Sequence, residues 1–134
     1  MKTITFYSYK GGVGRTLALA NIAKRISEFN KKVCILDFDL EAPGVPYKFK
    51  RYINISNIKS GIVDYIYNFQ ETYSPSKSIL DYTIEIKPDE KAKGLLSIIP
   101  SGNSNYQEYW NKLSAINWTD LLYRENSQGV AFFF

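Results

Sequence analysis

Histidine is absent from the 134 residues, cysteine occurs once, at Cys34, and no apolar run approaches the length of a membrane span. These absences exclude histidine-based acid–base catalysis, zinc sites of the Cys/His type, Cys–His nucleophiles and any disulfide within the chain. The remaining chemistry must use carboxylates, lysine and arginine, hydroxyls and the backbone. The N-terminus also lacks the apolar segment of a signal peptide, so we expect a soluble, cytoplasmic protein with no membrane segment.

The length of the chain indicates how many domains it forms, and the distribution of charge indicates where an anion would bind. A chain of 134 residues makes a single domain, able to bury about 68% of the surface that its unfolded form exposes. The net charge is +4, but residues 1–60 hold 11 basic and 4 acidic side chains, whereas residues 61–134 hold 6 and 9. We therefore expect an anion to bind in the N-terminal half.

The first 36 residues predict one strand–helix–strand unit. Thr3–Ser8 is β-branched and aromatic and predicts a strand that ends in a glycine cluster. Apolar residues then recur at helical spacing from Thr16 to about Asn30. The apolar run Val33–Leu36 predicts a strand covered on both faces of a parallel sheet. The crossover between the two strands should be right-handed.

The rest of the chain predicts shorter elements. The loop 42–46 is proline-rich and should be neither helix nor central strand. Further expected elements are a short helix over 62–69, a linker over 72–78, strands over 82–86 and 95–99, and a helix over 106–124. The last five residues, 130–134, are apolar with no polar cap, which predicts that the chain continues in a longer protein.

The segment Lys10-Gly-Gly-Val-Gly-Arg-Thr16 lies between the first predicted strand and the first predicted helix. Glycines allow positive φ and bring backbone N–H groups close to phosphate oxygens, and a helix N-terminus attracts anions. Lys10 and Arg15 add positive charge on both sides, and the Thr16 hydroxyl offers a ligand for Mg²⁺. This pattern in this context predicts a phosphate-binding loop, although Tyr9 and Arg15 depart from the common P-loop consensus.

The same segment, YSYKGGVGRTLALANIA, resembles the deviant Walker A loop of the ParA/MinD family of P-loop ATPases, in its arginine-bearing form. DFDLEAPG at residues 37–44 is similar to the family's switch I segment, and GLLSIIPSGN at residues 94–103 resembles, more weakly, the strand before the Walker B strand. The resemblance implies an α/β fold with a P-loop NTPase-like parallel sheet and flanking helices. No Walker B strand is present, so we expect residues 1–134 to be a single, truncated nucleotide-binding domain.

The resemblance also implies roles for individual residues. Lys10 matches the lysine that reaches across a nucleotide-sandwich dimer, and Asp39 matches an acidic residue near the attacking water, so both are expected to be catalytic. Metal ligands are expected at Thr16, Asp37 and Asp39. The residues expected to bind ATP are Lys10, Gly11, Gly12, Val13, Gly14, Arg15, Thr16 and Leu17.

We therefore expect an ATP- and Mg²⁺-binding module that, when complete, acts as a nucleotide-dependent dimerisation switch with slow ATP hydrolysis. The alternative is a non-catalytic, nucleotide-sensing or partner-binding part of a larger protein. A protein partner is expected but not identified. Lys48, Lys50 and Arg51 could contact nucleic acid, but a solvated basic face is the simpler interpretation of this cluster.

Overall fold

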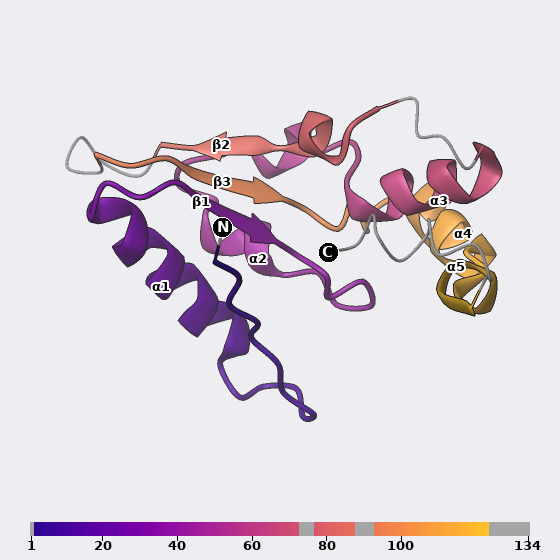
Figure 1. The fold of residues 1–134 in the computed structure, drawn as a ribbon, viewed down its shortest axis with the longest axis horizontal. Coiled ribbons are helices and arrows are strands. Elements are labelled where there is room, and N and C mark those ends of the chain that lie inside the picture. Colours follow the sequence, from indigo (N-terminus) through magenta and orange to yellow (C-terminus); the bar gives the residue numbers. More distant parts are fainter. Residues whose placement is uncertain (1, 73–76, 88–92, 124–134) are drawn as a thin grey trace.

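The fold is a small α/β unit, described by a computed structural model for residues 2–72, 77–87 and 93–123 (Figure 1). With η for a 3-10 helix, the elements in chain order are α1 (Arg15–Glu28), β1 (Val33–Leu36), α2 (Val45–Lys48), η1 (Ile55–Asn57), α3 (Ile62–Thr72), η2 (Ile79–Tyr82), β2 (Ile84–Ile86), β3 (Leu96–Ile99), α4 (Gln107–Ala115) and α5 (Trp118–Tyr123). The predicted α/β class is confirmed.

The sheet has the strand order β1-β3-β2 and is mixed (Figure 1). β3 pairs in parallel with β1, with Val33 opposite Leu96, and antiparallel with β2, with Ile84 opposite Ile98. All four residues of β3 are buried, as expected for a central strand without alternation. The expected parallel pairing is present between β1 and β3, whereas β2 joins the sheet as an antiparallel edge strand, which the expectation of a parallel sheet did not include.

Two apolar clusters stabilise the fold. One cluster joins α1 and α2 to the sheet, through Ala20, Ala23, Ile35, Val45, Phe49, Ile86, Leu96 and Ile98. The other gathers α3, α4 and α5 around the end of β3, through Leu40, Ile62, Val63, Tyr65, Ile66, Phe69, Tyr82, Ile99, Tyr109, Ile116 and Leu121. In Figure 1, α1 and the group α3–α5 accordingly lie in different parts of the molecule.

The predicted strand at Thr3–Ser8 is not formed. These residues have no strand pairing, and Ile4 and Tyr7 are 63% and 80% exposed. A strand needs a neighbour for its backbone N–H and C=O groups, and β-propensity alone does not supply one. The strand–helix–strand unit and its right-handed crossover are therefore absent from the described residues, and the N-terminal chain projects with the glycine-rich loop from the body of the molecule (Figure 1).

β1 forms where it was predicted, but its two faces differ. Ile35 is buried in the cluster with α1, whereas Cys34 is exposed and Leu36 is 45% exposed. The expectation that both faces are covered was therefore wrong. Among the described residues β1 pairs only with β3, so its second edge is open.

The remaining predictions are mostly confirmed, with changed bounds. The proline-rich loop 42–46 was expected to contain no helix, but α2 begins at Val45 because Pro46 fits the first turn of a helix. The single helix over 106–124 is two helices, α4 and α5, separated at Ile116 and Asn117. Residues 73–76 of the linker and the apolar run 130–134 lie outside the described residues.

A membrane span was not expected. None of the helices in the described parts of the chain has the length and apolar character needed to cross a bilayer.

Candidate phosphate-binding site

The glycine-rich loop ends at the N-terminus of α1. Gly12 and Gly14 have φ of +75° and +81°, a backbone region that residues with a Cβ rarely adopt. A Cβ added at Gly11, Gly12 or Gly14 would meet no atom within 4 Å, so the backbone of the loop is accessible to a ligand. Gly14 is the N-cap of α1 and offers no side-chain cap, and the first turn carries no acidic residue. The first N–H groups of α1 are thus available to an anion.

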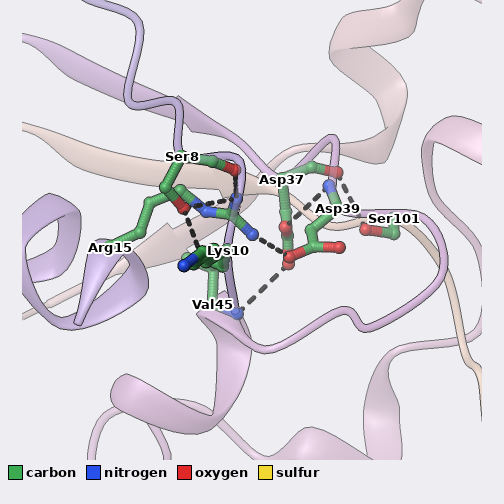
Figure 2. A network of polar contacts seen from close by, with 7 residues as sticks. All are labelled: Ser8, Lys10, Arg15, Asp37, Asp39, Val45 and Ser101. Carbon is green, nitrogen blue, oxygen red and sulfur yellow. Dashed lines mark hydrogen bonds and ion pairs between the residues drawn. The ribbon is translucent and has the colours of Figure 1, made fainter. Parts of the chain in front are cut away.

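Arg15 is the first residue of α1, and its guanidinium lies between two segments of the chain (Figure 2). Nη2 donates to the Asp39 carboxylate in an ion pair. Nη1 lies 3.2 Å from the Ser8 hydroxyl oxygen and 3.4 Å from the Ser8 carbonyl oxygen. The side chains of Arg15 and Asp39 are 30% and 33% exposed, so water reaches the pair. The structure thereby brings Arg15, expected to bind ATP, into contact with Asp39, expected to be catalytic and a metal ligand.

Asp37 follows β1 directly and holds the next loop in place (Figure 2). Its Oδ2 accepts from the Val45 backbone N–H at 3.1 Å, and its Oδ1 accepts from the Asp39 N–H at 3.4 Å. The Ser101 hydroxyl donates to the Asp37 carbonyl oxygen at 2.8 Å. Both ends of the loop 38–44 are therefore anchored through Asp37.

Burial governs the electrostatics of this anchor. Asp37 is 3% exposed, and this burial raises the pKa of its carboxyl above the usual value, although the backbone N–H donors oppose the shift. Tyr109 donates its hydroxyl to the Leu40 carbonyl oxygen at 2.7 Å. Burial, together with the nearby Asp37 carboxylate, raises the pKa of Tyr109 to about 12. Tyr109 therefore remains a neutral donor at physiological pH and fixes the middle of the loop.

The other predicted site residues lie around the glycine-rich loop. Lys10 is exposed, and its carbonyl oxygen accepts from the Ser8 hydroxyl at 3.0 Å. Val13 and Leu17 are 61% and 53% exposed, so both can contact a ligand on the surface. Thr16 is partly buried, and its methyl carbon would lie 3.9 Å from a Cβ added at Gly44, which places the loop 38–44 beside the start of α1.

The predicted magnesium ligands do not form a dense acidic cluster. In the described part of the chain, no group of three or more His, Cys, Asp and Glu side chains could hold a metal ion. The Asp37 carboxylate oxygens accept backbone N–H groups, and the Asp39 carboxylate pairs with Arg15. The oxygen donors at Thr16 and Asp39 are nevertheless of the kind that Mg²⁺ prefers, and this ion commonly takes only one or two protein ligands.

Sequence reasoning missed Ser8, Ser101 and Tyr109. Ser8 was assigned to a strand, so its contact with Arg15 was not expected. Ser101 carried a signal, since it lies two positions after the end of the central strand, at the edge where Asp37 also lies. Tyr109 carried no local signal, because its hydrogen bond to Leu40 spans 69 positions.

The chain was compared with known proteins. Residues 1–66 match a family model described as "ParA: NUBPL iron-transfer P-loop NTPase". Among curated proteins and solved structures, no match was found. The matched residues include the glycine-rich loop, α1, β1 and the loop with Asp37 and Asp39.

Proposed function

Residues 1–66 place the chain among the ParA/MinD-type P-loop NTPases, as an N-terminal portion of that fold, and from this premise we propose that it binds ATP with Mg²⁺. The observation that carries the proposal is the open glycine-rich loop at the uncapped start of α1, with Lys10 and Arg15 on either side. Residues 1–134 would then act as a single nucleotide-binding domain.

The nucleotide would be bound by groups of three kinds, of which the first two contact its phosphates. Backbone N–H groups of the loop, from Gly11 to Thr16, would donate to the phosphate oxygens, as in other helix N-terminal anion sites. Arg15 would add a planar, bidentate donor, which suits phosphate better than a point charge does. Val13 and Leu17, both exposed, would contact the rest of the nucleotide.

Mg²⁺ would neutralise phosphate charge, and its protein ligands would be the Thr16 hydroxyl and a carboxylate. Asp39 is the better placed carboxylate, because it is partly exposed, whereas Asp37 is buried and accepts two backbone N–H groups. Asp37 would then support the site by anchoring the loop that carries Asp39.

The proposed activity is a deviant Walker A switch, in which ATP promotes a homodimer and hydrolysis is slow. Phosphoryl transfer depends on positioning and on charge neutralisation. Lys10 is exposed and could reach the phosphates of a second copy, while Asp39 would orient the attacking water. Such a protein would work in the cytoplasm together with a protein partner.

A second candidate is a nucleotide sensor or partner-binding module without catalysis. The observation that favours it is the ion pair of Arg15 and Asp39, which occupies a phosphate ligand and the expected water-orienting residue at once. The iron transfer in the description of the matching family is not part of the proposal, since these 134 residues contain one cysteine and no histidine.

The dimer mechanism is tested by Lys10→Ala. A lysine that acts on the partner's phosphates lowers turnover strongly, on the order of 10³-fold for comparable cations supplied in trans, while ATP binding by the monomer stays nearly unchanged. Phosphate release and binding of a fluorescent ATP analogue should be measured side by side, with Lys59→Ala as a control for an exposed lysine outside the loop. Equal losses of turnover and binding would contradict action in trans, and binding without turnover in the wild type would favour the second candidate.

A further inference from the structure

The Arg15 guanidinium is occupied on both Nη atoms by groups of the protein itself (Figure 2). One Nη donates to the Asp39 carboxylate, and the other lies within hydrogen-bond distance of the Ser8 carbonyl and hydroxyl oxygens. A bidentate grip on phosphate would draw on the same guanidinium, whose charge and orientation the Asp39 carboxylate now holds. Carboxylate and phosphate therefore compete for one cation.

The exposure of the pair makes this competition reversible. About a third of each side chain is in contact with solvent, so the ion pair can be broken without unpacking the core. An ion pair that water reaches contributes less free energy than a fully buried one, and an incoming anion of higher charge can displace the carboxylate. A fully buried pair would not be open to such an exchange.

We propose that Asp39 is a positioning residue that acts through Arg15: it holds the guanidinium in the nucleotide-free chain, and a phosphate group must displace its carboxylate to bind. The inference rests on the proposed function, because it specifies how the same site is regulated. It adds a role for Asp39 before the nucleotide binds, separate from any role in orienting water.

The displacement would be transmitted to the loop 38–44. That loop is held at its ends by the hydrogen bonds of Asp37 and in its middle by Tyr109, which donates to the Leu40 carbonyl oxygen. Phe38 is 48% exposed and Glu41 is exposed, so the stretch between these anchors has room to move. Release of Asp39 from Arg15 would free this stretch while the anchors keep their places.

The test is a calorimetric titration of ADP into the full 134-residue chain, in EDTA and at low salt, so that metal ligation by Asp39 does not contribute. Asp39→Asn should tighten binding about two- to five-fold, the range expected for loss of an exposed ion pair, and Asp39→Glu should stay close to wild type. Glu41→Gln removes the same charge from the same loop and should change the affinity less. In an Arg15→Ala background, Asp39→Asn should no longer change the affinity for ADP, because the Asp39 carboxylate has no guanidinium left to pair with.

The outcomes separate the inference from the function on which it rests. Binding by the wild type with no gain in Asp39→Asn, or an equal gain in Glu41→Gln or in the Arg15→Ala background, would overturn the inference alone. If neither the wild type nor Asp39→Asn binds ADP or Mg²⁺ with an ATP analogue, the proposed function fails, and the inference fails with it. Circular dichroism should confirm that each variant is folded, and Asp39→Ser provides a second removal of the carboxylate if Asn disturbs the fold.

Discussion

At the scale of single residues, the site depends on where each carboxylate lies relative to solvent. Asp37 and Asp39 are two positions apart, yet Asp37 is buried against backbone N–H groups, whereas Asp39 is a third exposed and pairs with Arg15. Both residues follow the predicted strand Val33–Leu36, and the family resemblance implied that both are metal ligands. Their division into an anchor and a displaceable partner depends on the path of the loop 38–44, which the residue pattern does not specify.

Asp37 should make the stability of the fold depend on pH. Burial raises the pKa of its carboxyl in the folded chain above that of an unperturbed aspartate, about 3.9, so the folded state binds more protons than the unfolded state just above that pH. The contribution of Asp37 to the free energy of unfolding is therefore largest below that pH and falls as pH rises through the folded pKa. Asp37→Asn cannot titrate, and it also loses one of the two acceptors for backbone N–H groups, which costs about 1–3 kcal/mol.

The measurement is urea unfolding of the wild type and Asp37→Asn at several pH values from 4 to 7. The stability advantage of the wild type should narrow as the pH rises. If the difference in free energy of unfolding between the wild type and Asp37→Asn stays constant across this range, the Asp37 carboxyl has the same pKa in the folded and unfolded chains.

At the scale of elements, local patterns predicted those helices and strands that carry their own signal. Helical spacing located α1 and α3, and continuous apolar runs located β1 and β3. The prediction of a strand at Thr3–Ser8 was wrong, because a strand forms only where another segment is available to pair with it. The antiparallel direction of β2 could likewise not be predicted from the sequence, since its side-chain pattern is compatible with either direction.

Gly61 joins the start of α3 to the chain that leaves β3. A Cβ at this position would lie 2.1 Å from the Pro100 carbonyl oxygen and 2.6 Å from the Gly102 nitrogen, both of them backbone atoms. The Ile62 N–H also donates to the Pro100 carbonyl oxygen at 2.9 Å, so the two segments cannot separate without losing hydrogen bonds. Gly61→Ala should therefore destabilise the fold by about 2 kcal/mol or more, as expected for overpacking.

Gly11→Ala is the matched control, because a Cβ there meets no atom within 4 Å and its φ is not in the left-handed region. Thermal unfolding of both variants should lower the midpoint for Gly61→Ala and leave it nearly unchanged for Gly11→Ala. Similar midpoints for the two variants would mean that α3 does not pack closely against residues 100–102.

At the scale of the whole molecule, the described sheet has an open side. β1 is an edge strand with exposed Cys34 and Leu36, and neither a charge nor a proline interrupts its four residues. Natural sheets protect such edges, because unpaired N–H and C=O groups pair with other chains. The N-terminal chain, which is rich in β-branched and aromatic residues, also stays exposed beside the loop. The fold class was thus predictable from sequence, whereas the number and order of strands were not.

The open edge predicts that the chain associates as its concentration rises. Leu36→Lys puts a charge on this edge and should lower the apparent mass in static light scattering at high protein concentration. Leu80→Lys is the control, since Leu80 is 67% exposed but lies in η2 rather than on the edge of β1. Equal reduction by both substitutions would indicate association driven by general surface hydrophobicity.

The central claim is that the loop from Lys10 to Thr16 binds the phosphates of a nucleotide through its backbone and Arg15. Calorimetric titration of Mg²⁺ with a non-hydrolysable ATP analogue into the folded 134-residue chain tests it most directly. We expect a dissociation constant of about 1 μM, weakened roughly 10- to 100-fold by Arg15→Ala through loss of charge-assisted hydrogen bonds, and unchanged by Lys59→Ala. Absence of binding by the folded wild type, or an affinity that does not depend on Arg15, would contradict it.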